Sequence, residues 1–316
     1  MLVAGGAGFI GSHLCDALLA QGAHVCCLDN FDTGAEANVA RLLDHPRFTL
    51  VDCDVQQAAA PRADLILHLA SPASPIHYRR LSLETMLANS AGTLRLLELA
   101  RASGARFVYF STSEVYGEPL EHPQRESYRG NVNTLGPRAC YDEGKRFGEA
   151  LTWEFRRKYG VQATILRLFN TYGPRMAIED GRAIPAFVAA ALRGQPIPLF
   201  GDGRQTRSFC YVDDVVRAVI HVAGDDDADG LVLNIGNPHE TSLAELAEVV
   251  QRLARSSAGV QRLPLPEDDP SRRCPDIWRM MARYGWRPLV PLEDGLARTI
   301  EDFAARLGLQ ELEAVK

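Results

Sequence analysis

The chain of 316 residues lacks the features that define several classes of protein. It has no apolar run near the ~18 residues that a membrane-spanning helix needs, and it has no internal repeat or low-complexity segment. Its 34 lysines and arginines do not exceed its 40 aspartates and glutamates, so the net charge is −6. Such a chain has no overall positive field to attract nucleic acid or anionic lipid. We therefore expect a globular protein that binds neither nucleic acid nor a membrane.

The sequence also lacks the cysteine patterns of a metal or redox site. It has seven cysteines, an odd number, and no two of them have the C-x₂-C spacing of zinc or thiol redox sites. Most lie in apolar surroundings, such as residues 25–28, and no basic and apolar leader precedes the first motif. This pattern predicts buried thiols in a reducing compartment, a cytoplasmic location and no bound metal.

Lysine is the scarcest charged residue, with three lysines against 31 arginines. One of the three, Lys145, follows Tyr141 by four positions, which places both on one face of a predicted helix. Random placement of nine tyrosines and three lysines would give only about 0.09 such pairs. A neighbouring cation lowers the pKa of a phenol toward the range of a general base. We therefore predict that Tyr141 and Lys145 are catalytic, the alternative being an ordinary exposed helical pair.

Apolar runs alternate with helical periodicity through the first half of the chain. The predicted strands are 1–4, 23–28, 48–51, 65–69, 107–110 and 163–168, and the predicted helices are 9–19, 82–102 and 141–159. Continuous apolar strands that alternate with helices indicate an α/β fold, a doubly wound parallel sheet covered on both faces. Ligands of such sheets bind beyond the carboxyl ends of the strands.

The pattern of the sequence changes after residue 168, where the predicted elements are short and are separated by proline and glycine. We expect a dinucleotide-binding domain in residues 1–168 and a smaller, mainly substrate-binding α/β lobe in residues 169–316. Residues 208–232 are predicted to return to the first domain.

Three glycines, Gly5, Gly8 and Gly11, stand at the first predicted turn from strand to helix. Glycine is needed where such a turn is tight and where the backbone approaches a pyrophosphate beside a helix N-terminus. Asp29 follows about 20 residues on, at the end of the second predicted strand, where a carboxylate accepts ribose hydroxyls and repels a 2′-phosphate. These positions favour NAD over NADP, although a plain tight turn would also use glycine. Asp54, which ends the third predicted strand, is equally consistent with an adenine contact or a solvated carboxylate.

The fifth predicted strand runs into a stretch of hydroxyl side chains, Ser111, Thr112 and Ser113, followed by Glu114. Alone, these residues would be read as turn residues that cap the next element. Beside Tyr141, they form a set suited to oxidising an alcohol, in which Thr112 and Ser113 bind the substrate oxygen and Glu114 handles a second proton.

The glycine pattern, the Ser-Thr-Ser-Glu-Val-Tyr-Gly stretch and Tyr-x₃-Lys together resemble the extended short-chain dehydrogenase/reductases that act on nucleotide sugars, the NAD-dependent epimerase/dehydratase family. Six further segments resemble the UDP-glucuronate decarboxylase (UDP-xylose synthase) branch: 68–75, 136–146, 169–176, 180–182, 205–207, and 268–273 with 275–276. Related 4,6-dehydratases carry an acid at the position of Ser113, and 4-epimerases lack the glutamate at position 114. A dehydratase or epimerase is therefore the second hypothesis, and a non-catalytic NAD-sensing protein is the third.

The resemblance implies a reaction and a set of site residues. UDP-glucuronate is oxidised at C4, loses its carboxylate as CO₂ and regains hydride to give UDP-xylose, with Arg273 at the sugar carboxylate and Glu114 assisting. It also implies a homodimer that pairs through helices 82–102 and 141–159. The implied NAD-binding residues are Gly5, Gly8, Phe9, Ile10, Asp29, Asn30, Thr33, Gly34, Asp54, Val55, Leu69, Ala70, Ser71, Tyr141, Lys145 and Thr171. The implied substrate-binding residues are Tyr78, Asn170, Arg182, Arg207 and Arg273.

Overall fold

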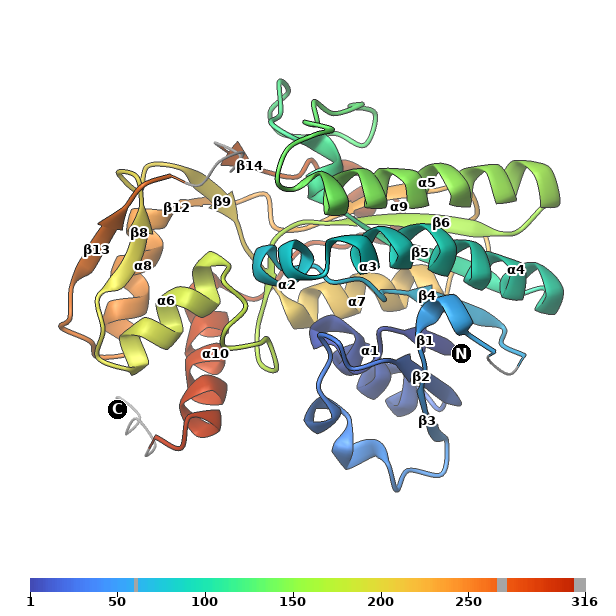
Figure 1. The fold of residues 1–316 in the computed structure, drawn as a ribbon, viewed down its shortest axis with the longest axis horizontal. Helices are drawn as coiled ribbons and strands as arrows, with labels where there is room; N and C mark the ends of the chain where they lie inside the picture. Colours follow the sequence, from blue (N-terminus) through green and yellow to red (C-terminus); the bar gives the residue numbers. More distant parts are fainter. Residues whose placement is uncertain (60–61, 266–271, 310–316) are drawn as a thin grey trace.

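The computed structural model describes residues 1–59, 62–265 and 272–309, and it has two lobes of unequal size (Figure 1). The larger lobe is a seven-stranded sheet with helices on both faces. The smaller lobe lies beyond the carboxyl ends of several of these strands (Figure 1). Within the described part of the chain, no helix combines the length and the apolar character needed to cross a bilayer.

The large sheet has the strand order β11-β6-β5-β4-β1-β2-β3, and every neighbouring pair is parallel. This order, with its reversal at β1, confirms the predicted doubly wound parallel sheet. Its strands are β1 (Leu2–Ala4), β2 (Val25–Asp29), β3 (Phe48–Asp52), β4 (Leu65–His68), β5 (Arg106–Thr112), β6 (Ala163–Leu168) and β11 (Val232–Ile235). The strand β11 lies outside the six predicted strands.

The continuous apolar runs of these strands serve two cores, one on each face of the sheet. Val3 and Leu67 belong to the core beneath α1 and α7, whereas Leu2 and Ile66 belong to the core beneath α4 and α5. Neighbouring residues of a strand point to opposite faces, so a strand covered on both sides has no polar positions to alternate. The helices of this lobe are α1 (Phe9–Ala20), α2 (Pro75–Arg80), α3 (Ser82–Leu87), α4 (Thr93–Ser103), α5 (Ala139–Tyr159), α7 (Val212–Ala223) and α9 (Trp278–Tyr284).

The predicted single helix over residues 82–102 is interrupted in the structure. A π-helical turn at Ala88–Gly92 separates α3 from α4. Within this turn Asn89 is fully buried, and its amide nitrogen donates to the Thr85 carbonyl and to the Ser71 hydroxyl, both at 2.8 Å. The Tyr109 hydroxyl donates to the amide oxygen of Asn89 at 3.1 Å. The turn thus directs an inward-facing amide to the sheet edge, and such π-helical turns occur frequently at functional sites.

The smaller lobe is built from short strands in three small sheets and from three helices that pack around their own apolar core. Its elements are β7 (Thr171–Tyr172), β8 (Ile197–Phe200), β9 (Thr206–Ser208), β10 (Cys210–Tyr211), β12 (Glu240–Ser242), β13 (Val260–Leu263), β14 (Arg272–Arg273), α6 (Ala183–Leu192), α8 (Leu243–Leu253) and α10 (Leu292–Arg306). Between β10 and β12 the chain crosses to the large sheet, where α7 packs on α1 and β11 pairs with β6. The predicted division into domains remains a prediction.

Candidate active site

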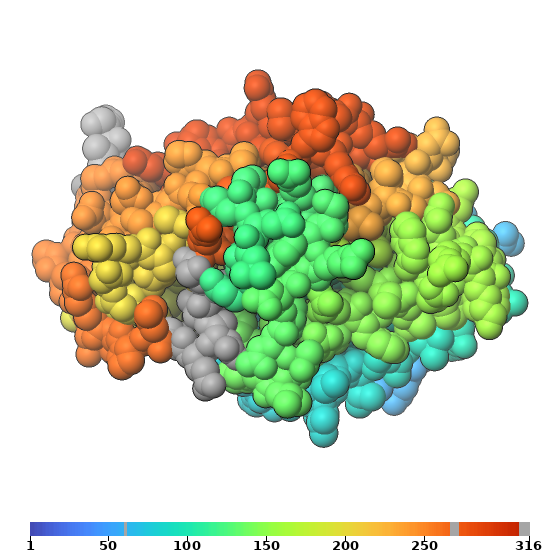
Figure 2. Space-filling model, turned by 90° about the horizontal axis from the view of Figure 1, so that it is seen from above, coloured from blue at the N-terminus to red at the C-terminus, as the bar shows by residue number. Residues whose placement is uncertain are grey.

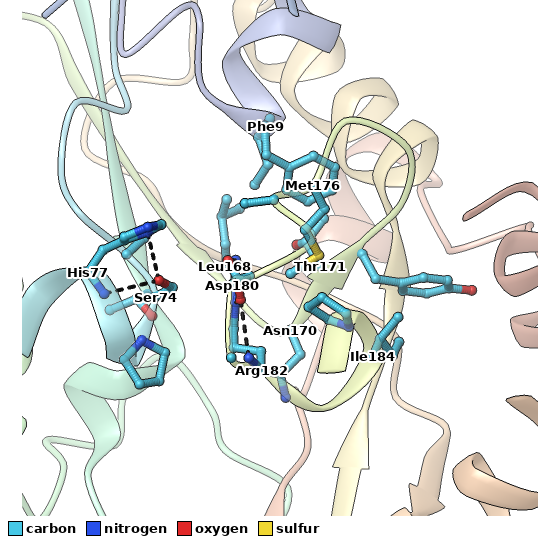
Figure 3. Close-up of a pocket in the computed structure, with 18 of the residues that line it drawn as sticks. Phe9, Ser74, His77, Leu168, Asn170, Thr171, Met176, Asp180, Arg182 and Ile184 are labelled. Atoms are coloured by element: carbon cyan, nitrogen blue, oxygen red, sulfur yellow. Dashed lines mark hydrogen bonds and ion pairs between the residues drawn. The ribbon is translucent and has the colours of Figure 1, made fainter. Parts of the chain in front are cut away.

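A cavity of about 870 Å³ opens between the two lobes at the carboxyl edge of the large sheet. The glycine loop, the end of β5 and the start of α5 form its wall on the side of the sheet, and residues of the smaller lobe form the opposite wall. Figure 3 shows part of this lining, with Ser74 and His77 on one side and Asp180 and Arg182 facing them. The predicted site residues that line the cavity are Gly5, Gly8, Phe9, Ile10, Thr33, Leu69, Ser71, Tyr78, Thr112, Ser113, Glu114, Tyr141, Lys145, Asn170, Thr171, Arg182, Arg207 and Arg273.

The glycine loop packs so tightly that side chains are excluded from it. Gly5 has a φ of +82°, and a Cβ atom there would lie 2.7 Å from the backbone nitrogen of Ala70. A Cβ atom on Gly11 would lie 2.1 Å from the carbonyl oxygen of Gly5. Gly8, the N-cap of α1, lines the cavity and has no side chain that could accept the first N–H groups of the helix. These N–H donors are therefore left for a ligand. This cradle fits the pyrophosphate of a dinucleotide.

The carboxylate of Asp29 fixes the path of the backbone around the loop. One of its oxygens accepts the Ala7 N–H at 2.9 Å, and the other accepts the Phe31 N–H at 3.0 Å. Burial raises the pKa of this carboxyl, and the hydrogen bonds from backbone N–H groups partly oppose the rise. Gly34 is required beside it, because a Cβ atom there would lie 2.7 Å from Asp29 Oδ1. The remaining lone pairs of the carboxylate suit the hydroxyls of a ribose.

Other predicted cofactor residues lie near this end of the sheet but outside the cavity lining. Asp54 caps the short 3₁₀ helix Val55–Gln57, where its Oδ1 accepts the Gln56 N–H at 2.8 Å. The Asn30 amide donates to Asp54 Oδ2 at 3.3 Å, and Val55 is buried against Gly92. Ala70 is the backbone that Gly5 approaches. For these residues, as for those that line the cavity, cofactor contact remains a prediction; the residues outside the lining are Asp29, Asn30, Gly34, Asp54, Val55 and Ala70.

Tyr141 and Lys145 are both buried on α5, and their mutual arrangement differs from the expected one. Lys145 Nζ donates to the Phe110 carbonyl at 2.8 Å and lies 6.0 Å from the centre of the Tyr141 ring. Burial lowers the pKa of Lys145 to about 7, although Glu149 opposes this. Burial also raises the pKa of Tyr141 to about 12, against a hydrogen bond with the Thr112 side chain. In the protein chain alone the pKa of Tyr141 therefore lies above the ordinary value of a phenol, because desolvation disfavours the phenolate, and a lowering of this pKa by Lys145 stays a prediction.

Glu114 stands at the centre of a cluster of positive charges. Its Oε2 accepts from Arg273 Nη2 at 3.2 Å and also from Arg138 Nη2. Burial opposes its ionisation, but the charges of Arg273, Arg138 and Arg207 outweigh burial and hold the pKa of Glu114 well below its usual range. Arg273 is almost fully buried, and its Nη1 donates to the Gly117 carbonyl at 2.7 Å. The structure thus brings Glu114 and Arg273 together across 159 residues of sequence.

Two members of this cluster, Arg138 and Asp142, were not among the predicted site residues. Asp142 Oδ2 lies 4.0 Å from Arg138 Nε, and its Oδ1 is buried with no hydrogen-bond partner. Burial, with the nearby charge of Glu114, raises the pKa of Asp142 to about 8. Both residues lie within the segment 136–146 that carries the resemblance, but no spacing rule connects them to Glu114, which is 24 residues from Arg138.

Tyr78 and Arg182 complete the surroundings of Tyr141. The Tyr78 ring stacks on the Tyr141 ring with centroids 5.2 Å apart and an angle of 8° between the planes. The Tyr78 hydroxyl is buried and has no hydrogen-bond partner, which leaves a donor for a ligand in the cavity. Arg182 pairs in bidentate fashion with Asp180, at 2.5 and 2.8 Å (Figure 3). Asp180 was also missing from the predicted site residues, although it begins the segment 180–182 that carries the resemblance.

Comparison with protein families assigns the chain to one of them. The profile described as "NAD dependent epimerase/dehydratase family" matches residues 1–236. The chain belongs to this family. The recognition made from the sequence motifs is confirmed.

Curated relatives within the family share a single description. UDP-glucuronic acid decarboxylase 1 of Arabidopsis thaliana is 47% identical over 97% of this chain and 70% of its own length. UDP-glucuronic acid decarboxylase 5 of the same plant is 47% identical over 98% of this chain and 91% of its own length. A UDP-glucuronic acid decarboxylase 1 of Danio rerio is 44% identical over 97% of this chain and 73% of its own length.

Solved structures with this fold have other activities in their titles. The UDP-glucuronic acid 4-epimerase of Bacillus cereus, in complex with UDP-glucuronic acid and NAD, superimposes with a TM-score of 0.89 at 29% identity, covering 96% of this chain and 99% of that one. A dTDP-glucose 4,6-dehydratase of Streptomyces venezuelae with NAD bound has a TM-score of 0.89 at 30% identity, and the alignment covers 97% of each chain. The fold is therefore common to epimerases and dehydratases, and sequence identity is higher with the decarboxylases.

Proposed function

We propose that this chain converts UDP-glucuronate to UDP-xylose and CO₂ with NAD as its cofactor. The observation that carries the proposal is the position of Glu114 between Arg138 and Arg273, beside the Tyr141–Thr112 pair in one cavity. A phenol placed to deprotonate an alcohol, next to a cationic cluster, suits a sugar that has both an alcohol to be oxidised by NAD and a carboxylate to lose. The relatives named as UDP-glucuronic acid decarboxylases, at 47% identity, support the same reaction.

The first step is oxidation at C4 of the sugar. Tyr141, acting as the phenolate, takes the proton of the C4 hydroxyl and becomes a neutral phenol, and Thr112, which hydrogen bonds to Tyr141, orients that hydroxyl. Bound NAD supplies the acceptor for the C4 hydride and later returns it. Lys145 is held in place by the Phe110 carbonyl and supplies positive charge near the phenol and the cofactor ribose.

Loss of CO₂ follows from the ketone at C4. The C6 carboxylate is then β to a carbonyl, so the C5–C6 bond breaks with its electron pair delocalised into the C4 oxygen, where Thr112 and Tyr141 stabilise the enolate. Arg273 directs the carboxylate, while ionised Glu114 beside it disfavours the charged carboxylate relative to departing neutral CO₂. C5 takes up one proton, and the returned hydride restores the C4 alcohol, so the overall reaction consumes one proton and no net reductant.

Binding of the nucleotide is assigned to the smaller lobe and its arginines. Asn170, Arg182 and Arg207 line that side of the cavity and suit the diphosphate, because guanidinium groups bind phosphate oxygens in pairs. Asp29, at the other end, supports NAD rather than NADP, since a second negative charge beside a buried carboxylate is unfavourable.

Two further expectations concern assembly and location. Apolar side chains are exposed on α3 and α5, with Leu83 at 69% and Phe147 at 52%, and these helices lie side by side (Figure 1). Such a patch supports the predicted homodimer, and a solution mass near that of one chain would contradict it.

All seven cysteines are free in the structure, which supports a reducing, cytoplasmic compartment.

The deciding experiment is incubation of the protein with UDP-glucuronate and NAD⁺, with products read by mass spectrometry. Release of CO₂ and formation of UDP-xylose, with no accumulation of NADH, is the expected result. A product of unchanged mass would indicate a 4-epimerase, and loss of water would indicate a dehydratase. Either product, in the absence of UDP-xylose, would overturn the proposal.

A further inference from the structure

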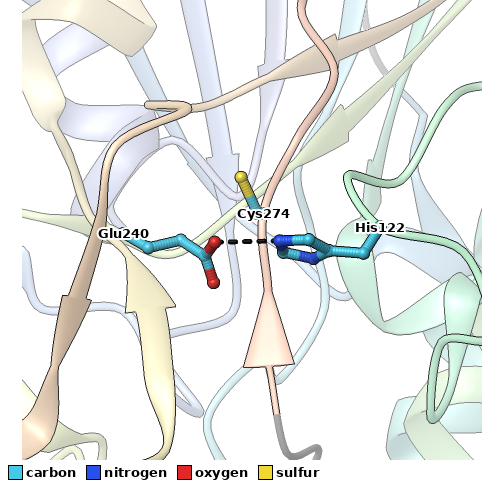
Figure 4. A group of neighbouring side chains, drawn as sticks. All are labelled: His122, Glu240 and Cys274. Carbon is cyan, nitrogen blue, oxygen red and sulfur yellow. Dashed lines mark hydrogen bonds and ion pairs between the residues drawn. The ribbon is translucent and has the colours of Figure 1, made fainter.

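Three side chains with metal-binding atoms meet outside the active-site cavity. They are His122, Glu240 and Cys274, and Figure 4 shows them converging from three separate segments. His122 Nε2 and Glu240 Oε2 are 2.9 Å apart, and the three ligand atoms, including the Cys274 sulfur, all lie within 4.8 Å of one another. None of the three lines the cavity.

The segments that supply these residues are far apart in sequence. His122 belongs to the segment after β5, Glu240 begins β12 and Cys274 directly follows β14. Gln124 joins two of them, because its side-chain oxygen accepts the Cys274 N–H at 2.9 Å and its own N–H donates to the Cys274 carbonyl at 2.9 Å. In Figure 2 the green segment after β5 adjoins the orange-red segments that follow β14. The backbone around the three side chains is therefore fixed by hydrogen bonds.

The chemistry of the three groups is that of a zinc site. One imidazole nitrogen, one carboxylate oxygen and one thiol sulfur are ligand types that Zn²⁺ prefers, and three protein ligands leave a fourth position for water. The His122 and Glu240 side chains are 25% and 27% exposed, so an ion can reach them from solvent, whereas Cys274 closes the inner side. A second contact orients the carboxylate, since the Thr206 hydroxyl donates to Glu240 Oε1 at 2.6 Å and leaves Oε2 toward His122.

We infer that His122, Glu240 and Cys274 form a binding site for one Zn²⁺ ion that holds the three segments together. On binding, the thiol of Cys274 releases its proton to solvent as the sulfur–zinc bond forms, and the thiol exchanges its contact with the Pro238 carbonyl, at 3.3 Å, for the metal. A small movement of Cys274 Sγ toward the His122–Glu240 pair completes the set. Because Arg273 precedes Cys274, the ion would also anchor the backbone that carries the arginine of the active site.

The test is metal binding to the full chain, stripped with chelator and kept reduced with a phosphine. Co²⁺ is the spectroscopic probe, because a tetrahedral site with a thiolate ligand gives visible d–d bands, and Zn²⁺ is then added in competition. We expect one Co²⁺ per chain, displaced by Zn²⁺, and a higher melting temperature with Zn²⁺. Cys274→Ser and His122→Ala should weaken Zn²⁺ binding by at least about 100-fold, and Thr206→Val by about 10-fold, the lower end of the effect of losing an orienting contact.

Cys53→Ser is the control, because Cys53 is a half-buried free cysteine outside the cluster, and the variant should bind Zn²⁺ like the parent protein. A second measurement needs no variant: Zn²⁺ should slow alkylation of Cys274 relative to Cys53 in the same sample, as read by peptide mass spectrometry. The inference is overturned if no cobalt–thiolate spectrum appears, if Cys274→Ser binds Zn²⁺ as well as the parent, or if Zn²⁺ leaves Cys274 alkylation unchanged. None of these outcomes depends on the proposed enzymatic activity.

Discussion

The two ends of the cavity are built by different means. At the cofactor end, the fit comes from the backbone: Gly5 and Gly11 allow contacts that a single Cβ atom would prevent, and Asp29 accepts only backbone N–H groups. At the substrate end, the fit comes from charged side chains, with Glu114 held by Arg138 and Arg273. The cofactor end is fixed by sterics, and the substrate end by a balance of charges.

This difference suggests how specificity is divided within one family. In this chain the backbone cradle leaves no room for a Cβ atom at Gly5 or Gly11. The charged side chains of the substrate end can differ while the fold stays the same, since structural neighbours with other activities in their titles have TM-scores of 0.89 at 29% and 30% identity. Substitutions at the two ends should therefore have different effects. Those at the cofactor end should lower NAD⁺ affinity, and those at the substrate end should lower turnover.

The largest effect is expected where the two ends meet, at Tyr141. Tyr141→Phe removes the phenolic oxygen that takes the C4 proton, so kcat should fall by about 10³-fold, within the usual range for a general base. Binding of UDP-glucuronate, measured by calorimetry, should change little, because the ring still stacks on Tyr78. Tyr159→Phe, at the partly exposed end of the same helix, is the control and should retain full activity. Full turnover by Tyr141→Phe would refute the mechanism.

The next largest effect is expected on NAD⁺ affinity, from a substitution at the cofactor end. Gly11→Ala would place a Cβ atom 2.1 Å from the Gly5 carbonyl oxygen, so the loop must shift. We expect NAD⁺ affinity to fall by about 100-fold, near the upper end of the usual cost of overpacking. Gly224→Ala is the control, because its Cβ atom would have ordinary contacts at 3.4 Å or more. Unchanged NAD⁺ affinity in Gly11→Ala, measured by titration, would show that the cradle does not hold the cofactor.

The sequence was more informative about the cofactor end than about the substrate end, because the first is built from local backbone geometry and the second from side chains that are distant in sequence. Local spacing encodes the glycine loop, and apolar runs encode the parallel sheet, so both could be predicted. The contacts of Glu114 with Arg138 and Arg273 join residues 24 and 159 positions apart, and spacing carries no signal for them. In such an arginine-rich chain, only the resemblance singled out Arg273.

Burial explains two further differences between sequence and structure. The pKa of Tyr141 was predicted to fall beside Lys145, but burial raises it, and sequence separation does not report desolvation. The helix over 82–102 was predicted to be continuous, but the buried amide of Asn89 accompanies a π-helical turn that apolar periodicity does not reveal. Both differences arise from polar groups placed in the interior, which pattern analysis treats as surface.

A smaller effect is expected at the substrate end from Arg138→Gln. The change removes one of the cations that keep Glu114 ionised, so the pKa of Glu114 should rise and the acidic limb of the kcat/KM profile should move to higher pH. We expect kcat/KM near pH 7 to fall by about 10- to 100-fold, the usual value of a hydrogen bond to a charged group. Arg125→Gln, an exposed arginine of the same segment, is the control. An unchanged pH profile would mean that Arg138 does not act through Glu114.

The smallest effect, visible only with pH, is expected from Asp142→Asn. The pKa of Asp142 is raised to about 8, so this carboxyl is mostly neutral at pH 7 and gains its negative charge as the pH rises through 8. That charge appears beside Glu114 and opposes the substrate carboxylate, so kcat/KM of the parent should decline above pH 8. Asp142→Asn is always neutral; it should match the parent near pH 7 and exceed it a few-fold at pH 9, on the order of 1 kcal/mol.

The control for this comparison is Glu154→Gln, which removes an exposed carboxylate near the far end of the same helix, the partner of Arg157. Because Glu154 is paired with Arg157 and is not among the charges that raise the pKa of Asp142, its loss should leave the alkaline limb unchanged. If Asp142→Asn instead loses activity at pH 7, Asp142 is ionised in the working enzyme and pairs with Arg138. The substrate end would then carry one more negative charge than its buried geometry indicates. The contrast with the sterically fixed cofactor end would rest on three ion pairs made by two carboxylates, rather than on the two pairs of Glu114 with Arg138 and Arg273.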